Sequence, residues 1–271
     1  MTNIVITGCS TGIGLATAKY LQDKFVKVYP TARKQKDVEM LKSLGFENAM
    51  YLDVTKPESI HNVIEAVRKQ DGTIDVWFNN AGFGQAGAVE DISTKVLKAQ
   101  FETNVLGLHE CTIQVIPVMR AQGYGKIIQH SSVLGIVSLF GRGAYNASKY
   151  AIEGLNDTLR LELKDTGIYP VLLNTGPITS DFRKTAMKKL QQNVDIENSV
   201  HRLVYKKSLE GKHKKVPFNE EATSVAAVIH RIILADKPKP RYYITTATYI
   251  LGYLKRILST SLLDKVLHKL G

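Results

Sequence analysis

Residues 7–14 read Thr7-Gly8-Cys9-Ser10-Thr11-Gly12-Ile13-Gly14, and this glycine-rich stretch directly follows a short apolar run that begins at Asn3. A helix-period pattern opens at Ile13, so the stretch is predicted to be the turn between a first strand and a first helix. Its glycines allow a tight turn and let a pyrophosphate approach the backbone, while the helix N-terminus favours the negative charge. The glycine spacing is GxxxGxG rather than GxGxxG. The stretch therefore predicts a nucleotide-binding turn.

Short β-branched runs alternate with longer helix-period segments through most of the chain. The predicted strands are Asn3–Thr7, Val26–Thr31, Ala49–Leu52, Ile74–Asn79, Lys126–Ser131, Tyr169–Asn174 and Arg241–Ile244. The predicted helices include Ile13–Lys24, Val38–Leu44, Glu58–Lys69, Tyr145–Asp165 and Glu220–Leu234. This alternation implies right-handed crossovers and a parallel sheet covered on both faces. We therefore expect residues 1–245 to form one α/β domain, a Rossmann-type doubly wound parallel sheet that binds ligands beyond the carboxyl ends of its strands.

The bulk composition limits the class of protein. A chain of 271 residues with 44% apolar content buries one substantial core, and a second full domain is not expected. Two cysteines and seven scattered histidines give neither a disulfide framework nor a metal motif, so we expect a reducing compartment and no metal. The start MTNIVITG leaves no room for a signal peptide, and the longest uncharged apolar stretch near the end of the chain, Tyr242–Leu254, is too short to span a bilayer. We therefore expect a soluble, cytoplasmic protein.

The net charge of +11 is concentrated in two segments. Residues 183–218 hold ten Lys/Arg against three acids, within a polar, weakly periodic stretch (178–218) that we interpret as an irregular lid on the substrate side. Residues 246–271 hold four Lys/Arg against one acid. A local basic excess indicates an anionic partner. Nucleic acid is not expected, because the basic residues are not interleaved with aromatics in a known binding motif.

The tail, residues 246–271, is predicted to be one amphipathic basic helix. Its apolar positions are Ile250, Leu251, Leu254, Ile257, Leu258, Leu262, Val266 and Leu267, with Lys255, Arg256, Lys265 and Lys269 between them. Two interpretations stay open. The helix packs on its own domain or on a neighbouring subunit of a homo-oligomer, or it lies on a membrane surface and collects lipid-soluble substrate. For the basic lid, from Arg183 to Lys215, the alternatives are a solvated face, membrane contact and binding of a substrate phosphate.

The end of the second strand indicates which dinucleotide binds. An acidic residue at this position bonds the ribose 2′-hydroxyl, whereas an arginine accommodates a 2′-phosphate. Here the chain reads Thr31-Ala32-Arg33-Lys34, with no acid between Asp23 and Asp37. Because Arg33 can form a charge-assisted pair with a phosphate, NADP(H) is favoured over NAD(H).

Tyr145 and Lys149 lie four residues apart at the start of a helical pattern, so both side chains share one face. A nearby ammonium moves the pKa of a phenol toward the working range of acid–base catalysis. Ser132, at the end of a strand, can hydrogen-bond a reacting oxygen. A Tyr-xxx-Lys pair alone is weak, because a second one occurs at Tyr20 and Lys24. Tyr145 differs because other chemical groups are expected to lie near it, namely the glycine turn, Asn79-Asn80-Ala81-Gly82, Asn104 and Ser132.

This combination resembles the short-chain dehydrogenase/reductase family. The matching segments are TGxxxGIG (7–14), NNAG (79–82), Asn104, Ser132 and Tyr145-Asn-Ala-Ser-Lys149, continued by Asp53-Val54 and Gly176-Pro177-Ile178. The resemblance covers the chain up to about residue 245. Thr175 and Ser180 depart from the pattern, since relatives more often have proline and threonine there.

The resemblance implies a role for each matched residue. Tyr145 is the general acid/base, Ser132 positions the carbonyl, Lys149 lowers the pKa of the tyrosine and holds the nicotinamide ribose, and Asn104 anchors a proton-relay water. The cofactor contacts are assigned to Gly8, Ser10, Thr11, Gly12, Ile13, Gly14, Arg33, Asp53, Val54, Asn80, Ala81, Gly82, Tyr145, Lys149, Pro177, Ile178 and Ser180.

Within the family, TGCSTGIG followed by TAR is similar to the NADP-preferring hydroxysteroid and retinol dehydrogenase branch and to bacterial NADP-dependent aldehyde reductases. This likeness implies reduction of a hydrophobic aldehyde or ketone. Two alternatives are a phosphate-bearing lipid ketone, such as acyl-dihydroxyacetone phosphate, and a nucleotide-binding sensor without catalysis. The filled catalytic positions argue against the sensor.

Overall fold

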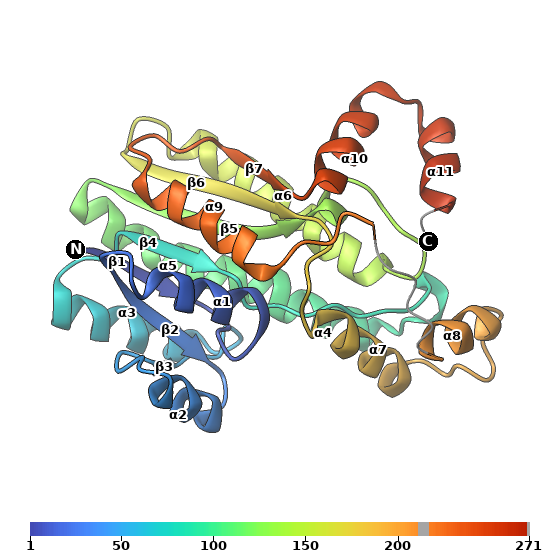
Figure 1. Ribbon diagram of the computed structural model, residues 1–271, viewed down its shortest axis with the longest axis horizontal. Coiled ribbons are helices and arrows are strands. Elements are labelled where there is room, and N and C mark those ends of the chain that lie inside the picture. The colour runs from blue at the N-terminus through green and yellow to red at the C-terminus, as the bar shows by residue number, and fades with distance from the viewer. Residues whose placement is uncertain (211–216, 270–271) are drawn as a thin grey trace.

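Seven strands form one parallel sheet in the order β3-β2-β1-β4-β5-β6-β7 (Figure 1). The computed structural model describes residues 1–210 and 217–269. The strands are β1 (Thr2–Ile6), β2 (Val26–Ala32), β3 (Met50–Tyr51), β4 (Val76–Asn79), β5 (Gly125–Ser132), β6 (Ile168–Thr175) and β7 (Arg241–Ile244). All seven predicted strands are confirmed, with ends that differ by at most two residues. The strand order reverses between β1 and β4, the point where such sheets bind ligands.

Helices cover both faces of the sheet, because successive strand residues point to opposite sides. Ile4 and Ile6 face a core covered by α1 (Gly12–Leu21), α2 (Gln35–Ser43) and α9 (Ala222–Leu234). Val5 faces the other core, covered by α3 (Pro57–Asp71), α5 (Gly107–Gln122) and α6 (Gly143–Glu162). The predicted doubly wound sheet is therefore confirmed.

The basic segment after β6 is helical, so the prediction that it is irregular was wrong, while its place on the substrate side stays a prediction. It contains α7 (Phe182–Asn193) and α8 (Arg202–Leu209). Ala186 and Leu190 share one face of α7 and are buried in a small core with Ala86 and Ala88. The many lysines around these apolar residues hide the helical period in the sequence. Residues 211–216 of the predicted lid lie outside the described residues.

The tail forms two helices, which corrects the prediction of a single one: α10 (Thr246–Ile257) and α11 (Thr260–His268), a hairpin beyond the end of β7 (Figure 1). The chain turns at Leu258 and Ser259, both in extended conformation. This break lets Leu263 and Leu267 pack with Leu251 against the loop that follows Ser132. One straight helix could not bring both halves of the apolar stripe onto the same loop. Leu270, the end of the predicted pattern, lies outside the described residues.

Among the residues that the structure describes, no helix combines the length and the apolar character that a membrane crossing requires.

The packing of the tail makes a testable distinction between two adjacent leucines. Leu263 is 3% exposed, whereas Leu262 is 50% exposed. Leu263→Ala should lower the free energy of unfolding by about 2–5 kcal/mol, because it leaves a cavity against the loop after Ser132. Leu262→Ala is the matched control and should change it by less than about 0.5 kcal/mol. Urea unfolding measures the free energy of unfolding of both variants. Equal losses in the two would contradict the packing of Leu263 against the loop after Ser132.

Candidate active site

The glycine turn leaves β1 and enters α1 with its backbone uncovered. Gly8 and Gly12 have φ angles of +73° and +59°, in the left-handed region that favours glycine. A Cβ on Gly14 would lie 2.4 Å from the Gly8 carbonyl oxygen and 2.6 Å from Nδ2 of Asn80. No acidic side chain stands in the first turn of α1. The turn is therefore a backbone cradle at a helix N-terminus, which fits a pyrophosphate.

The turn after β4 is bonded directly to this cradle. Nδ2 of Asn80 donates to the carbonyl oxygens of Thr7 and Gly8, at 2.9 and 3.0 Å. Oγ1 of Thr7 accepts from the backbone N–H groups of Asn80 and Ala81, both at 2.9 Å. The structure thus brings residues 7–14 and 80–82 together at the reversal of strand order.

The adenine end of the predicted cofactor site lies at the neighbouring strand ends. The N–H of Cys9 donates to the carbonyl oxygen of Thr31 at 2.8 Å, which places the cradle against the end of β2. Arg33 follows β2 directly and is exposed. Asp53 accepts from the N–H and the hydroxyl of Thr55, at 3.0 and 2.8 Å, and so shapes its own turn. Val54 packs so closely against Gly107 that a Cβ there would lie 2.7 Å from its methyl group.

The segment after β6 covers the cradle from the other side. Ile178 pairs with Glu220, and the N–H of Glu220 donates to the carbonyl oxygen of Pro177 at 3.1 Å. A Cβ on Gly12 would lie 3.6 Å from Cβ of Ser180. Ser180, and with it the segment that contains Pro177 and Ile178, therefore lies beside the cradle.

Tyr145 lies in the first turn of α6 and is buried. Burial raises the pKa of its phenol to about 12, although the hydroxyl of Ser132 and the charge of Arg142 act to lower it. The ring of Phe182, from the start of α7, lies 5.2 Å from the ring of Tyr145. The phenol is thus a neutral proton donor at neutral pH in a site shielded by α7.

Lys149 lies one turn further along α6. Its ammonium donates to the carbonyl oxygen of His130 at 2.5 Å and stands 5.6 Å from the centre of the Tyr145 ring. Burial lowers the pKa of Lys149 to about 8, while the carboxylate of Glu153 acts to raise it. The ammonium is therefore held at the site but can lose its proton at moderately alkaline pH.

The two serines at the end of β5 differ in what they contact. The hydroxyl of Ser132 donates to the carbonyl oxygen of Thr175 at 3.3 Å and accepts from the N–H of Leu134 at 3.1 Å. The hydroxyl of Ser131 points to the other side of the strand and bonds Glu153. Ser132 thus stands on the side of Tyr145, and together their hydroxyls can bind one carbonyl oxygen.

Asn104 lies in a π-helical turn, Glu102–Leu106, between α4 (Thr94–Phe101) and α5. Its side chain accepts from the N–H of Phe83 at 3.1 Å and donates to the carbonyl oxygen of Phe83 at 2.9 Å and to Ser148 at 3.3 Å. Such turns often occur at functional sites. The side chain of Asn104 thus joins the loop after β4, at Phe83, to α6 at Ser148, the residue before Lys149.

Sequence reasoning missed His130 and Arg142, and it noted Thr175 only as a departure from the family pattern. Burial, with Lys149 nearby, lowers the pKa of His130 to about 3, so the ring is neutral. Its two nitrogens lie 3.1 Å from Oδ1 of Asn80 and 3.1 Å from Oγ1 of Thr175. One signal was available, because residues two apart on a strand share a face and His130 precedes Ser132 by two. Arg142 carries no such signal.

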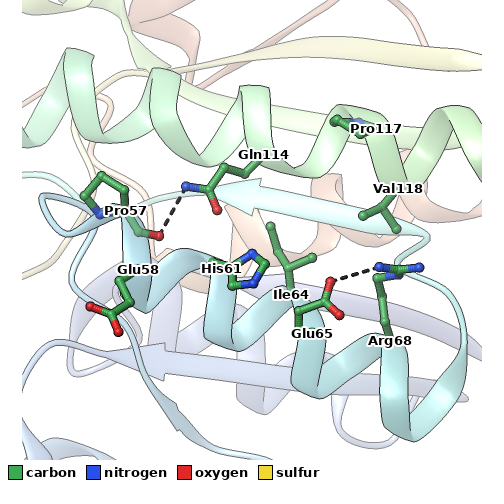
Figure 2. Close-up of a pocket in the computed structure, with 9 residues that line it drawn as sticks. All are labelled: Pro57, Glu58, His61, Ile64, Glu65, Arg68, Gln114, Pro117 and Val118. Atoms are coloured by element: carbon green, nitrogen blue, oxygen red, sulfur yellow. Dashed lines mark hydrogen bonds and ion pairs between the residues drawn. The ribbon is translucent and has the colours of Figure 1, made fainter.

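A separate surface hollow runs along α3 and α5 (Figure 2). It is bounded by polar contacts such as Gln114 to the carbonyl oxygen of Pro57, at 3.2 Å, and Arg68 to Glu65, at 2.9 Å. Its lining contains none of the residues of the glycine cradle or of the Tyr145 site. Chemistry is therefore expected at the strand ends and not here.

Comparison with known proteins agrees with this geometry. A family model described as short chain dehydrogenase matches residues 2–191. The oxidoreductase YbbO of Escherichia coli K12 is 36% identical over 98% of this chain and 93% of its own. A 3-ketodihydrosphingosine reductase of Bacteroides thetaiotaomicron is 31% identical over 87% of this chain and 84% of its own. The crystal structure of a short-chain dehydrogenase from Streptomyces avermitilis covers 98% of this chain and 93% of its own, with 26% identity and a TM-score of 0.74.

The matched region includes the glycine cradle, Ser132, Tyr145 and Lys149, and the resemblance expected from the sequence is confirmed. This chain belongs to the short-chain dehydrogenase family of oxidoreductases.

Proposed function

We propose that this protein uses NADP(H) to reduce the carbonyl group of a hydrophobic aldehyde or ketone. The observation that carries the proposal is the meeting of the Tyr145 and Ser132 hydroxyls beside the glycine cradle, at the carboxyl ends of the central strands. A sensor without catalysis would not need a buried, protonated phenol beside a second hydroxyl and an ammonium.

The residues divide the work of reduction among them. A nicotinamide cofactor, when bound, supplies the hydride. The hydroxyls of Ser132 and Tyr145 hold the substrate oxygen, and Tyr145 gives its proton to that oxygen as negative charge develops there. The ammonium of Lys149 stabilises the phenolate that remains, and Asn104 supports the relay that returns the proton.

NADP(H) is proposed as the cofactor because of Arg33. It is exposed directly beyond β2, and its strand end is bonded to the cradle through Cys9 and Thr31. The guanidinium can therefore reach a 2′-phosphate on a dinucleotide that lies in the cradle.

A hydrophobic substrate is supported by the surroundings of the site. Phe182 lies against Tyr145, and the loop after Ser132 is apolar, with Val133 and Val137 buried. The Bacteroides relative is named a 3-ketodihydrosphingosine reductase, which is consistent with apolar surroundings of this kind.

A phosphate-bearing lipid ketone is the second candidate, and one observation favours it. Arg142 stands beside Tyr145, and the charge of Arg183 nearby helps burial to lower its pKa. Two arginines that repel one another beside a reacting carbonyl form a site for an anionic group of the substrate.

We also propose a cytoplasmic protein that touches anionic membrane surfaces through its tail. Tyr249, Ile250, Tyr253 and Ile257 lie on one side of α10 and are exposed, the last two by 58% and 76%. Lys255 and Arg256 are exposed beside them. Aromatic and aliphatic side chains flanked by cations match the boundary of an anionic bilayer. Because α10 contacts the loop after Ser132, the membrane would lie next to the substrate side.

Replacing Tyr145 with Phe tests the chemistry. Turnover of a long-chain alkanal with NADPH should fall by about 10²–10⁴-fold, because the proton donor is lost, while NADPH binding measured by fluorescence is retained. Tyr20→Phe is the matched control, since Tyr20 also precedes a lysine by four residues and the ammonium of Lys24 lies 5.6 Å from its ring. Near-normal turnover in Tyr145→Phe would exclude this mechanism. Running acyl-dihydroxyacetone phosphate in parallel decides between the two substrate classes.

Replacing Arg33 with Ala tests the cofactor. KM for NADPH should rise by about 10- to 100-fold, which corresponds to loss of a charge-assisted bond, and KM for NADH should stay unchanged. Lys42→Ala, an exposed cation at the far end of α2, is the control. A parallel rise for both cofactors would show that Arg33 does not discriminate between them.

Co-sedimentation with vesicles tests the membrane contact. The protein should bind phosphatidylglycerol-containing vesicles, bind phosphatidylcholine vesicles more weakly, and be released by salt. Tyr253→Ser/Ile257→Ser should abolish binding, whereas Leu161→Ser, at an exposed leucine near the end of α6, should not. No binding, or a homo-oligomer that the double variant dissolves, would overturn the proposal.

A further inference from the structure

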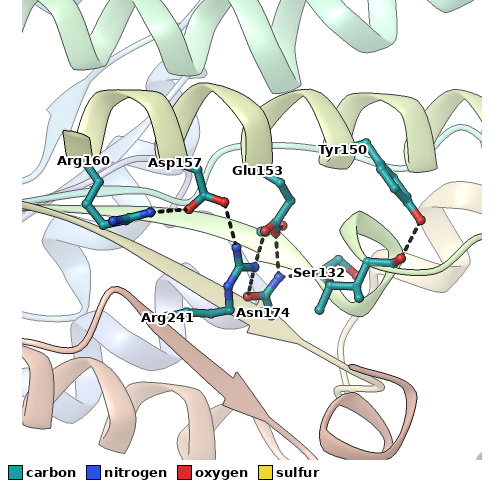
Figure 3. Close-up of polar contacts among 9 residues, drawn as sticks. Ser132, Tyr150, Glu153, Asp157, Arg160, Asn174 and Arg241 are labelled. Atoms are coloured by element: carbon teal, nitrogen blue, oxygen red, sulfur yellow. Dashed lines mark hydrogen bonds and ion pairs between the residues drawn. The ribbon is translucent and has the colours of Figure 1, made fainter. Parts of the chain in front are cut away.

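Behind Ser132 lies a buried network of charged and polar side chains that the proposed reaction does not use (Figure 3). At its centre is Glu153, one helical turn after Lys149 on α6, with a side chain 12% exposed. A buried carboxylate is costly unless it is paired, so the partners of Glu153 are informative.

Both carboxylate oxygens of Glu153 are bonded. Oε1 accepts from the hydroxyl of Ser131 and from Nδ2 of Asn174, the latter at 2.6 Å. Oε2 forms an ion pair with Arg241, the first residue of β7. Arg241 also donates to Oδ1 of Asn174 at 3.0 Å and to Asp157 at 3.3 Å. One carboxylate thus joins α6 to β5, β6 and β7.

These bonds converge on the backbone of Ser132. Ser131 precedes it, and Nδ2 of Asn174 donates to the carbonyl oxygen of Ser132 at 3.2 Å as well as to Glu153. The loop that follows is pressed onto the same carboxylate, because a Cβ on Gly135 would lie 2.8 Å from Oγ of Ser131 and 3.0 Å from Oε1 of Glu153. The network therefore holds the chain before and after Ser132.

We propose that Glu153, held by Arg241, is a positioning residue that fixes Ser132 against Tyr145 and keeps a negative charge one turn from Lys149. This inference rests on the proposed function of Ser132, Tyr145 and Lys149. Glu153 touches neither the cradle nor the hydroxyl of Tyr145, so it acts through its neighbours. Loss of its bonds lets Ser132 move, and displacement by about 1 Å is enough to cost about 100-fold in rate.

The effect on pH dependence follows from the charges at the site. Tyr145 and Glu153 on α6 and the neutral His130 on β5 face Lys149, while Arg142 and Arg183 lie on the side of Tyr145. Lys149 and Asp157 on α6 and Arg241 on β7 face Glu153. Since the carboxylate acts to raise the pKa of Lys149, its removal lowers that pKa. The loss of reductase activity at alkaline pH should then begin at a lower pH.

Glu153→Gln is the first variant, with Glu162→Gln, an exposed glutamate on the same helix, as the matched control. We expect kcat with NADPH and a long-chain alkanal to fall by about 10- to 100-fold, with KM for NADPH unchanged. The midpoint of the alkaline limb should move to lower pH. A purely structural role would lower the rate equally at all pH values and leave this midpoint in place.

The double variant Glu153→Gln/Arg241→Gln replaces the ion pair with two amides, so that Arg241 is not left as a charge without its partner. It should regain part of kcat but keep the lowered midpoint, and it serves as the test if Glu153→Gln does not fold. The inference would be overturned if the Glu153 variants fold but have the same kcat and the same midpoint of the alkaline limb as the Glu162→Gln control. A different result would contradict the proposed function: a wild-type protein without reductase activity, or a Tyr145→Phe variant that keeps it.

Discussion

The close approach of the glycine turn to the end of β4 is the constraint on which the site depends. Gly14 can lie against the carbonyl oxygen of Gly8 and the amide of Asn80 only because it has no side chain, and a Cβ on Gly8 would lie 2.9 Å from Cα of Ala81. This contact joins β1 and β4 where the strand order reverses. His130 then carries the connection onward, from Asn80 to Thr175 through its ring and to Lys149 through its carbonyl. The cradle and the catalytic groups are therefore parts of one bonded unit.

Burial at the strand ends sets the protonation states that the chemistry needs. Desolvation keeps His130 neutral and Tyr145 protonated, and it brings the pKa of Lys149 down to about 8. The charge of Arg142 beside Tyr145 and the carboxylate of Glu153 behind Lys149 act against this effect of burial, each favouring the charged form of its neighbour. A phenolate is tolerated in this environment only beside positive charge. Lys149 on α6 and Arg142, the residue before α6, carry such charge next to Tyr145.

The sheet and the glycine cradle could be predicted because their signals are local. A strand is a short β-branched run, and residues 7–14 combine turn, strand end and helix start within eight positions. The Glu153 network could not be predicted, because Ser131, Asn174 and Arg241 meet Glu153 only when three strands lie side by side. The break of the tail at Leu258 and Ser259 was missed for a similar reason. Its apolar pattern also fits one continuous helix, and only the loop after Ser132 decides where each half packs.

The loop after Ser132 connects the tail to the candidate active site. On its inner side Gly135 is pressed onto Glu153, and the hydroxyl of Tyr150 on α6 donates to the carbonyl oxygen of Ile136 at 2.6 Å. On its outer side Val133 and Val137 are covered by Leu251, Leu263 and Leu267 of the tail. The loop is thus held between a polar network and an apolar one. The helix that buries Leu251 in this layer also carries the exposed side chains of α10. The tail is therefore joined by packing to the chain that directly follows Ser132, through residues 133–137.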